Sequence, residues 1–390
     1  MARNISVGID VGTYQVKVVI AASENKGETV RPIILGTGFA TSRGMRHGYI
    51  INENETVRSI KKASAQAEKT AGIHIKKAFL SIGGVGLEEI RVKSDVAIGR
   101  GDGEVTDLDI KNLLNVCEEK AAQKLLNRKI VHSIPLAYKI DGSEVLGAPQ
   151  GMKGIKLETD VLFIACLEAH LNQLVRSVED AGIEVIDVMA APIAASLVTL
   201  SKAQKIAGCV LANVGAETVS IVVFENNIPI SLKVFPIGST DITNDIALGL
   251  KVSLEEADEL KRGSIINPSH PQKKLDEIIR ARLNDILDLI NAHLSKIGKN
   301  GLLPAGIILT GGGSGITTIE DLARAILQLP SKVASLNVTN LPRETIKDST
   351  WAVAYGLSIW GLSSKEESLG LSVARQTGGT IRDLIRQFLP

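Results

Sequence analysis

Residues 6–20 and 209–223 carry the same pattern of residue types, although they lie far apart in the chain. Each segment has an apolar strand, then an acid or an amide (Asp10 in the first, Asn213 in the second), then a turn that contains glycine, and then a second apolar strand. Turn glycines let backbone N–H groups approach a phosphate closely. Two such hairpins predict two related half-molecules that bind one nucleotide between them.

Composition limits the class of protein. A chain of 390 residues is too long for one hydrophobic core and suits two lobes, with room for an inserted module. The formal net charge is +1 and only 3% of the residues are aromatic. We therefore expect no nucleic-acid partner, because neither a basic surface nor a base-stacking platform is indicated.

The three cysteines and six histidines are scattered without metal-binding spacing. Cys117, Cys166 and Cys209 each sit in an apolar stretch, so we expect them to be buried and free. We find no N-terminal signal region, and no apolar run reaches the ~18 residues of a spanning helix. The expectation is a cytosolic chain, unless something else attaches it to a membrane.

The order of strands and helices predicts two lobes separated by an insert. Residues 1–82 form the first lobe, 83–182 an inserted α+β subdomain, and 183–362 the second lobe, whose first and last helices return to the first lobe. Residues 363–379 are rich in serine, glycine and charge and predict a flexible linker before a final segment at 380–390.

Three short sequence patterns predict where helices begin and where a hairpin turns. Asn54 is the predicted N-cap of a helix over 54–71. The pair Thr106 and Asp109 predicts a capping box that opens a second helix. Asp141-Gly142 predicts a tight hairpin turn in the insert.

A glycine loop follows the strand predicted at 306–310. It reads Gly311-Gly312-Gly313-Ser314-Gly315 and runs towards a helix, so its backbone donors can lie near a ligand. The loop lacks the lysine of a Walker A loop. It also does not match the G-x-G-x-x-G pattern of dinucleotide-binding proteins, because Ile316 stands where that pattern needs glycine. Alone, the loop fits a structural turn as well as a nucleotide site. Together with the two hairpins it favours a nucleotide site, in which this loop closes over the base.

These segments resemble the motifs of a known superfamily. Asp10-x-Gly12-Thr13 with Lys17, the hairpin at 209–223, and Leu309-Thr310-Gly311-Gly312-Gly313 are similar to the phosphate-1, phosphate-2 and adenosine motifs of actin, Hsp70 and sugar kinases. Within that superfamily the chain resembles the bacterial cell-division family FtsA along nearly its whole length. The narrower likeness rests on residues 131–138 inside the insert, on the connecting segment 236–250, and on the amphipathic tail.

The resemblance implies an α/β, actin-like two-lobed fold with duplicated ribonuclease-H-like domains and an inserted α+β subdomain. It implies ATP and Mg²⁺ as cofactors, with Asp10 positioning the metal through water. The implied nucleotide-binding residues are Gly12, Thr13, Lys17, Asn213, Gly215, Thr218, Gly238, Asp258, Lys261, Gly311, Gly312, Gly313 and Ser314. Asp258 stands where the family usually has glutamate. The alternative for Asp258 and Lys261 is a solvated helix face.

The second hairpin departs from the superfamily pattern. Asn213 replaces the acid that helps to hold Mg²⁺-bound water, and an amide carries no charge. Ala216 and Glu217 occupy turn positions where small residues normally approach phosphate. We expect Glu217 to be paired with a cation or turned to solvent, because it would otherwise repel the γ-phosphate. Phosphoryl transfer depends on positioning and charge stabilisation, so nucleotide binding with slow hydrolysis or none is the expectation.

The segment 380–390 has one apolar face, which is typical of a helix that lies in a membrane interface. A docked terminal helix is the alternative. Because about three turns bind lipid weakly alone, several copies in a polymer are expected to attach together. The apolar residues are Ile381, Leu384, Ile385, Phe388 and Leu389, and the opposite face carries Arg382 and Arg386.

The resemblance implies an ATP-binding protein that polymerises on the cytoplasmic face of the cell membrane at the division site. Its implied partners are other copies in a filament, the C-terminal tail of the tubulin-like FtsZ, anionic lipid, and later division proteins. A small-molecule kinase is one alternative, but residues 189–196 offer no carboxylate base. A pilus-type scaffold is the other, although such proteins generally lack the tail helix. A basic segment around Lys273, Lys274, Arg280 and Arg282 fits either an acidic partner or a solvated face.

Overall fold

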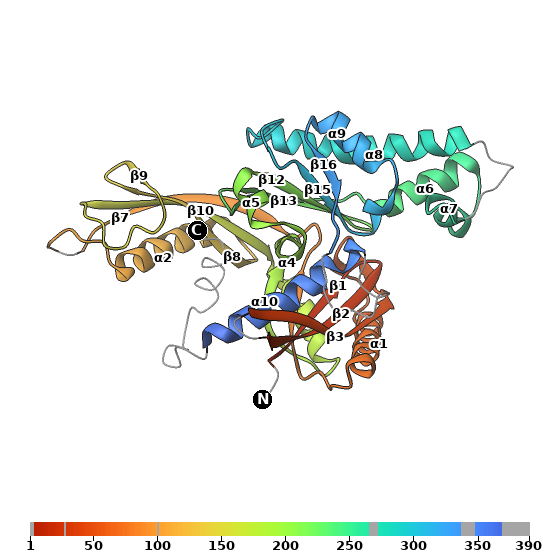
Figure 1. Cartoon of the computed structure of the whole chain (residues 1–390), viewed down its shortest axis with the longest axis horizontal. Coiled ribbons are helices and arrows are strands. Elements are labelled where there is room, and N and C mark those ends of the chain that lie inside the picture. The colour runs from red at the N-terminus through yellow and green to blue at the C-terminus, as the bar shows by residue number, and fades with distance from the viewer. Residues whose placement is uncertain (1–3, 27–28, 100, 265–271, 337–347, 369–390) are drawn as a thin grey trace.

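Two five-stranded sheets organise the chain (Figure 1). The computed structural model describes residues 4–26, 29–99, 101–264, 272–336 and 348–368. The first sheet has the strand order β11-β6-β1-β2-β3. Strands β1, β2 and β3 are antiparallel neighbours, whereas β6 and β11 are added in parallel. These strands are β1 (Ile5–Val11), β2 (Gln15–Lys26), β3 (Thr29–Thr41), β6 (Lys77–Ile82) and β11 (Glu184–Ala190).

The second sheet repeats this topology in the order β14-β13-β12-β15-β16. The expected two-lobed fold with duplicated halves is confirmed. The sequence pattern did not reveal the edge strands β11 and β16, because β11 lacks a clear apolar alternation and β16 has only three residues. The strands are β12 (Cys209–Val214), β13 (Val219–Glu225), β14 (Ile228–Phe235), β15 (Ile307–Thr310) and β16 (Ser331–Val333).

The two sequence-related hairpins also share their turn geometry. The Gly12 N–H donates to Gln15 O at 3.2 Å, and the Gly215 N–H donates to Thr218 O at 2.9 Å. A Cβ at Gly12 would lie 2.9 Å from Gln15 O, and one at Gly215 would lie 2.8 Å from Thr218 O. Both turns therefore require glycine for the same close approach of backbone to backbone.

Helix α10 (Ala352–Ser368) packs against β1 and β2 of the first sheet and against α4 (Ala191–Thr199). The contact is unusually close, because a Cβ at Gly8 would lie 2.1 Å from Ala354 O and one at Gly356 would lie 1.9 Å from Ala194 O. Trp360 packs edge-on against Phe79, with ring centroids 5.0 Å apart. The prediction of a linker over 363–379 is wrong for residues 363–368, because these residues continue α10. They contain no glycine or proline to stop the helix.

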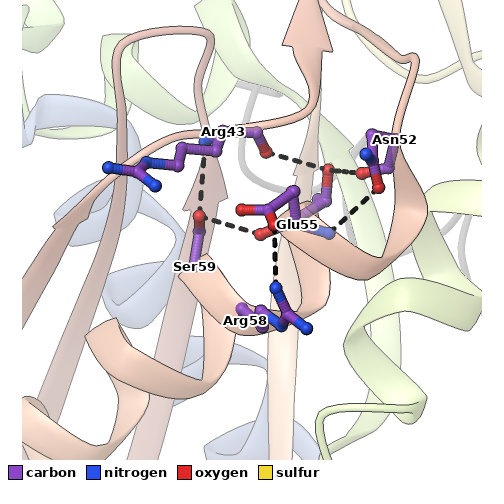
Figure 2. A network of polar contacts seen from close by, with 6 residues as sticks. Arg43, Asn52, Glu55, Arg58 and Ser59 are labelled. Atoms are coloured by element: carbon purple, nitrogen blue, oxygen red, sulfur yellow. Dashed lines mark hydrogen bonds and ion pairs between the residues drawn. The ribbon is translucent and has the colours of Figure 1, made fainter.

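The N-terminus of α1 (Glu53–Ala71) is capped by Asn52, whose side chain accepts from the Glu55 N–H at 3.2 Å (Figure 2). The expected cap, Asn54, is wrong, because Asn52 has the extended backbone of a cap and Asn54 already lies within the helix. Ser59 Oγ accepts from the Arg43 N–H at 3.3 Å, which ties α1 to the preceding loop. That loop contains two short strands, β4 (Met45–Arg46) and β5 (Tyr49–Ile50).

The insert is a four-stranded sheet, in the order β7-β10-β8-β9, with one helix (Figure 1). Both local signals in it are confirmed: Thr106 and Asp109 form a capping box, and the turn residues Asp141 and Gly142 have φ of +49° and +83°. Its elements are β7 (Glu88–Ala97), α2 (Asp107–Lys124), β8 (Arg128–Ile140), β9 (Ser143–Val145) and β10 (Lys156–Leu167).

Helix α3 (Glu168–Glu179) falls within the range expected for the insert, 83–182, but packs mainly elsewhere. It contacts α1, β5 and β11 together more than β8 and β10 of the insert, and its buried Leu174 and Val178 pack in the same core cluster as the first sheet. The compact insert therefore ends with β10.

Helices cover the second sheet, led by the long α8, whose apolar stripe includes Leu283, Leu287 and Leu294. The short α5, which opens with a capping box at Ser201, was missed because six residues give little periodicity. The helices are α5 (Lys202–Ala207), α6 (Ser239–Leu250), α7 (Leu254–Lys261), α8 (Gln272–Lys296) and α9 (Ile319–Leu327), with 3₁₀ turns at Gly312–Gly315 and Ser349–Trp351. In the described part of the chain, no helix combines the length and hydropathy needed to cross a bilayer.

The insert also contacts the second lobe. Glu89 Oε1 accepts from Ser231 Oγ at 2.8 Å and Glu89 Oε2 accepts from the Leu232 N–H at 2.5 Å. Ser231 Oγ lies 2.8 Å from His293 Nε2, and Arg91 donates to the Ile230 carbonyl. Because these bonds join β7 to β14 and α8, the insert is held by both lobes.

His132 makes the stability of the fold sensitive to acid. It is buried on β8, its Nε2 accepts from the Ala190 N–H at 2.9 Å, and burial lowers its pKa to about 3. A histidine with a lowered folded pKa binds fewer protons in the folded than in the unfolded chain. Its full contribution to stability is therefore present above pH 6.5 and falls as the pH drops towards 3.

We expect the wild-type chain to lose about 2 kcal/mol through His132 between pH 7 and pH 5, and a His132→Leu variant to lose that much less over the same interval. Urea unfolding at a series of pH values measures the difference. Equal pH slopes in the two proteins would contradict the assignment.

Candidate functional site

A cleft of about 740 Å³ lies where the turns of both hairpins meet the glycine loop. Residues from the first lobe, the second lobe and the segment before α10 line it together. Twelve residues expected in the site are among the lining residues. They are Asp10, Gly12, Thr13, Lys17, Asn213, Gly215, Thr218, Asp258, Lys261, Gly311, Gly312 and Gly313.

Asp10 and Lys17 face each other in register across the β1–β2 hairpin. Burial raises the pKa of Asp10, although Ser81 Oγ donates to its Oδ1 at 2.7 Å and Lys17 lies near. Burial lowers the pKa of Lys17, whose Nζ donates to Thr350 O at 2.9 Å. A half-buried carboxylate that borders open space fits a divalent cation held through water.

No group of three or more acidic, histidine or cysteine side chains in the described ranges could hold a metal by itself. A cation near Asp10 would therefore take most of its ligands from phosphate oxygens and water, as Mg²⁺ commonly does in nucleotide sites.

The glycine loop is pressed against the second hairpin. Gly311 has φ of +87°, and a Cβ there would lie 2.3 Å from Asn213 Oδ1. A Cβ at Gly313 would lie 2.4 Å from Val214 Cγ1. A Cβ at Gly312 meets nothing within 4 Å, and this residue is exposed to the cleft. The loop thus offers one open backbone surface to a ligand.

Ser314 and Gly238 do not line the cleft, which corrects their expected place in the site. Ser314 is buried and its Oγ donates to Gly311 O at 2.7 Å, so it shapes the glycine loop from behind. Gly238 precedes α6 and passes close to the second turn, since a Cβ there would lie 2.3 Å from Ala216 O. The next two amides hold that turn: Ser239 N–H donates to Gly215 O at 2.9 Å and Thr240 N–H to Ala216 O at 2.8 Å.

Asp258 and Lys261 form an ion pair of 2.8 Å inside the cleft, rather than a freely solvated helix face. Lys261 Nζ also donates to Thr243 Oγ1 at 2.6 Å. Partial burial works against ionisation of Asp258, yet the hydrogen bond and charge of Lys261, together with Arg262, hold its pKa below the usual value. A fixed pair of opposite charges can bind the hydroxyl and amino groups of a nucleoside.

Sequence reasoning missed Tyr14 and Arg262, which line the cleft and contact each other. Arg262 donates to the Tyr14 hydroxyl at 3.0 Å, and its guanidinium lies 5.7 Å from the ring centroid. Both residues line the cleft, and they come from different lobes. The position of Arg262 directly after Lys261 was the available signal. Nothing in the sequence marked Tyr14.

Within the described ranges Glu217 is not paired with a cationic side chain, and it is not fully turned to solvent, so that expectation is wrong. It is half-buried, and its Oε2 accepts from the backbone N–H of His47 in the first lobe at 2.5 Å. Glu217 is not among the residues that line the cleft.

The basic residues expected on α8 are not among those that line the cleft. On α8, Lys273, Lys274 and Arg280 are exposed, whereas Arg282 is paired with Asp245 at 2.7 Å. The tail residues lie outside the described part of the chain. They are Ile381, Arg382, Leu384, Ile385, Arg386, Phe388 and Leu389.

Two family models match this chain. "Cell division protein FtsA" matches residues 210–356, and "SHS2 domain inserted in FTSA" matches residues 84–165. The second match coincides with the unit that runs from β7 to β10 and leaves out α3. The insert boundary drawn from packing and the one drawn from the family model therefore agree.

Solved structures show the same fold. The "PilM-PilN type IV pilus biogenesis complex" aligns with a TM-score of 0.70 at 16% identity, over 92% of this chain and 98% of that chain. MreB5 of Spiroplasma citri bound to ADP aligns with a TM-score of 0.51 at 13% identity, over 94% of this chain and 99% of that chain. Identities this low support the actin-like fold and nothing finer.

Sequence similarity is more specific than the shared fold. The "Cell division protein FtsA" of Bacillus subtilis is 30% identical over 376 residues, which cover 91% of this chain and 83% of that protein. This alignment spans both lobes and the insert. The pilus biogenesis complex is similar in structure, but its sequence is only 16% identical. The chain belongs to the FtsA family of bacterial cell-division proteins.

Proposed function

We propose that this chain binds Mg-ATP between its lobes, polymerises on the cytoplasmic face of the cell membrane at the division site, and tethers FtsZ filaments there through their C-terminal tails. The observation that carries the proposal is the convergence of the two matching turns and the glycine loop on one cleft of about 740 Å³, in a chain of the FtsA family. Later division proteins are further partners under this proposal.

The nucleotide would lie with its phosphates between the turns at Gly12 and Gly215 and its nucleoside near Lys261 and Gly312. Backbone N–H groups in glycine turns suit phosphate oxygens. Asp10 would orient water around Mg²⁺, which supplies positive charge to the phosphates when bound. A structural neighbour, MreB5, is described as bound to ADP, which supports a nucleotide in this fold.

We further propose that hydrolysis is slow or absent. Asn213 lines the cleft at the end of β12, where an acid could help to position an attacking water. An amide accepts and donates hydrogen bonds but carries no charge, so it stabilises a cation and its water less well. Binding of ATP would then act mainly on the shape of the chain and on its assembly.

Membrane attachment rests on the amphipathic pattern of residues 380–390. We expect deletion of residues 378–390, or Leu384→Glu, to release the protein from vesicles that contain anionic phosphatidylglycerol, because each change removes or charges the apolar face. ATP affinity should stay unchanged. Sedimentation of vesicles, with and without ATP, measures the effect.

Leu384→Met is the matched control, because it keeps the apolar face and should still pellet. A truncated chain that pellets as well as the full chain would contradict membrane attachment through this segment. Equal binding to neutral vesicles would contradict an attraction of Arg382 and Arg386 to anionic headgroups.

A further inference from the structure

Glu217 and His47 connect the second turn of the nucleotide site to the opposite lobe. The His47 N–H donates to Glu217 Oε2 at 2.5 Å, and His47 Nδ1 lies 3.1 Å from Glu217 O. One residue of the first lobe thus contacts both the side chain and the backbone of one residue of the second. Both residues are half-buried.

The first-lobe side of this contact is rigid. His47 has φ of +47° in the turn between β4 and β5, and its carbonyl accepts from the Val85 N–H at 3.3 Å. A Cβ at Gly48 would lie 2.3 Å from the Cα of Gly84, so backbone packs directly on backbone. The ring of Tyr49 packs against His170 with centroids 4.9 Å apart. The turn therefore presents the His47 N–H from a fixed position.

The second-lobe side is held as well. Gly215 and Ala216, which precede Glu217, accept the Ser239 and Thr240 amides at the start of α6. The turn that borders the proposed phosphate space is thus fixed to its own lobe through its backbone, and to the other lobe through Glu217. If the lobes separate, the Glu217–His47 contact must break.

We propose that Glu217 and His47 are positioning residues that hold the second turn against the first lobe and keep the cleft closed around its ligand. The kinetic consequence rests on the proposed binding of ATP. A carboxylate that faces phosphates is unfavourable, and here Glu217 accepts from the His47 N–H and does not line the cleft. Loss of this contact should let the cleft open more often and release nucleotide faster.

Three variants separate the parts of the contact. Glu217→Ala removes the acceptor, Glu217→Gln removes the charge but keeps an acceptor oxygen, and His47→Gly removes the ring but keeps the N–H and tolerates the positive φ. Glu184→Gln is the matched control, because that glutamate is exposed and pairs only with Lys77 in the described structure.

The first measurement needs no nucleotide. Amide hydrogen exchange at His47 should be at least about tenfold faster in Glu217→Ala than in the wild type, since a hydrogen bond to a charged acceptor is lost. It should change little in Glu184→Gln. Equal exchange at His47 in the wild type and Glu217→Ala would overturn the contact itself, whatever the chain binds.

The second measurement is the release of a fluorescent ATP analogue, chased by excess unlabelled ATP with Mg²⁺. We expect Glu217→Ala to release it about tenfold to a hundredfold faster, Glu217→Gln to stay within about threefold of the wild type, and His47→Gly to lie between. Slower release in both Glu217 variants would show that charge repulsion dominates and would overturn the proposal. A wild type that binds no analogue refutes ATP binding instead, and the exchange experiment still decides the contact.

Discussion

Replacing Gly312 with aspartate should weaken Mg-ATP binding about thirtyfold while the protein stays folded. Gly312 faces the cleft, and a Cβ there meets nothing within 4 Å. The new side chain therefore fits, but it places a negative charge beside the proposed nucleotide. The phosphates of that nucleotide lie beyond the nucleoside, so for a charge about 8 Å from the nearest phosphate, at an effective dielectric of about 20, the repulsion is about 2 kcal/mol.

Two control variants separate charge from shape. Gly312→Ala adds a methyl group in the same open space, so it should keep most of the affinity. Gly101→Asp makes the same change at a position where a Cβ also meets nothing within 4 Å, but in the insert and away from the cleft. Titration calorimetry gives the affinity and thermal unfolding checks the fold. A Gly312→Asp protein with wild-type affinity would mean that the glycine loop does not border the nucleotide.

Gly356→Ala should destabilise the fold by about 3 kcal/mol or more. Within a helix, glycine to alanine normally stabilises by about 1 kcal/mol. In α10 the added Cβ would lie 1.9 Å from Ala194 O in α4, so the two helices would have to move apart. Because the obstacle is backbone in a tightly packed core, no side-chain rotation can relieve it.

Gly249→Ala provides the matched comparison, since it is the same change within helix α6. Its Cβ would lie 2.6 Å from Ile278 Cδ1, the end of a flexible side chain that can turn away. We expect its effect to stay within about 1 kcal/mol. Urea unfolding of both variants measures the difference. Equal effects at the two glycines would contradict the close backbone packing of α10 on α4.

Features that depend on neighbouring residues could be predicted from the sequence. The turns at Gly12 and Gly215 and the capping box at Thr106 follow from local backbone geometry, which a few residues determine. The duplication extended this local information to the whole fold, because two similar hairpins require two similar sheets. The sequence placed the glycine loop in one site with the two hairpins, but the close approach of Gly311 to Asn213 emerged only from the structure.

Features that depend on distant residues could not be predicted in this way. The periodicity of α3 shows an apolar face but not which sheet that face will meet, so the helix was assigned to the insert instead of the first lobe. Glu217 was expected to face a cation or solvent. Its partner is instead a backbone N–H in the other lobe, which the residues around Glu217 in the sequence do not reveal. The Tyr14–Arg262 contact has the same origin, since it forms only when the lobes meet.

The packing of α10 on β1 has a consequence for the order of events during translation. Strand β1 leaves the ribosome early, whereas residues 352–368 that cover it are made after every strand of both sheets. The second sheet can be completed once residue 333 has emerged, but the first must wait, with Gly8 and its neighbours uncovered. The lobe that is synthesised first therefore closes last, and a nascent chain halted before α10 would expose an apolar face for chaperones to bind.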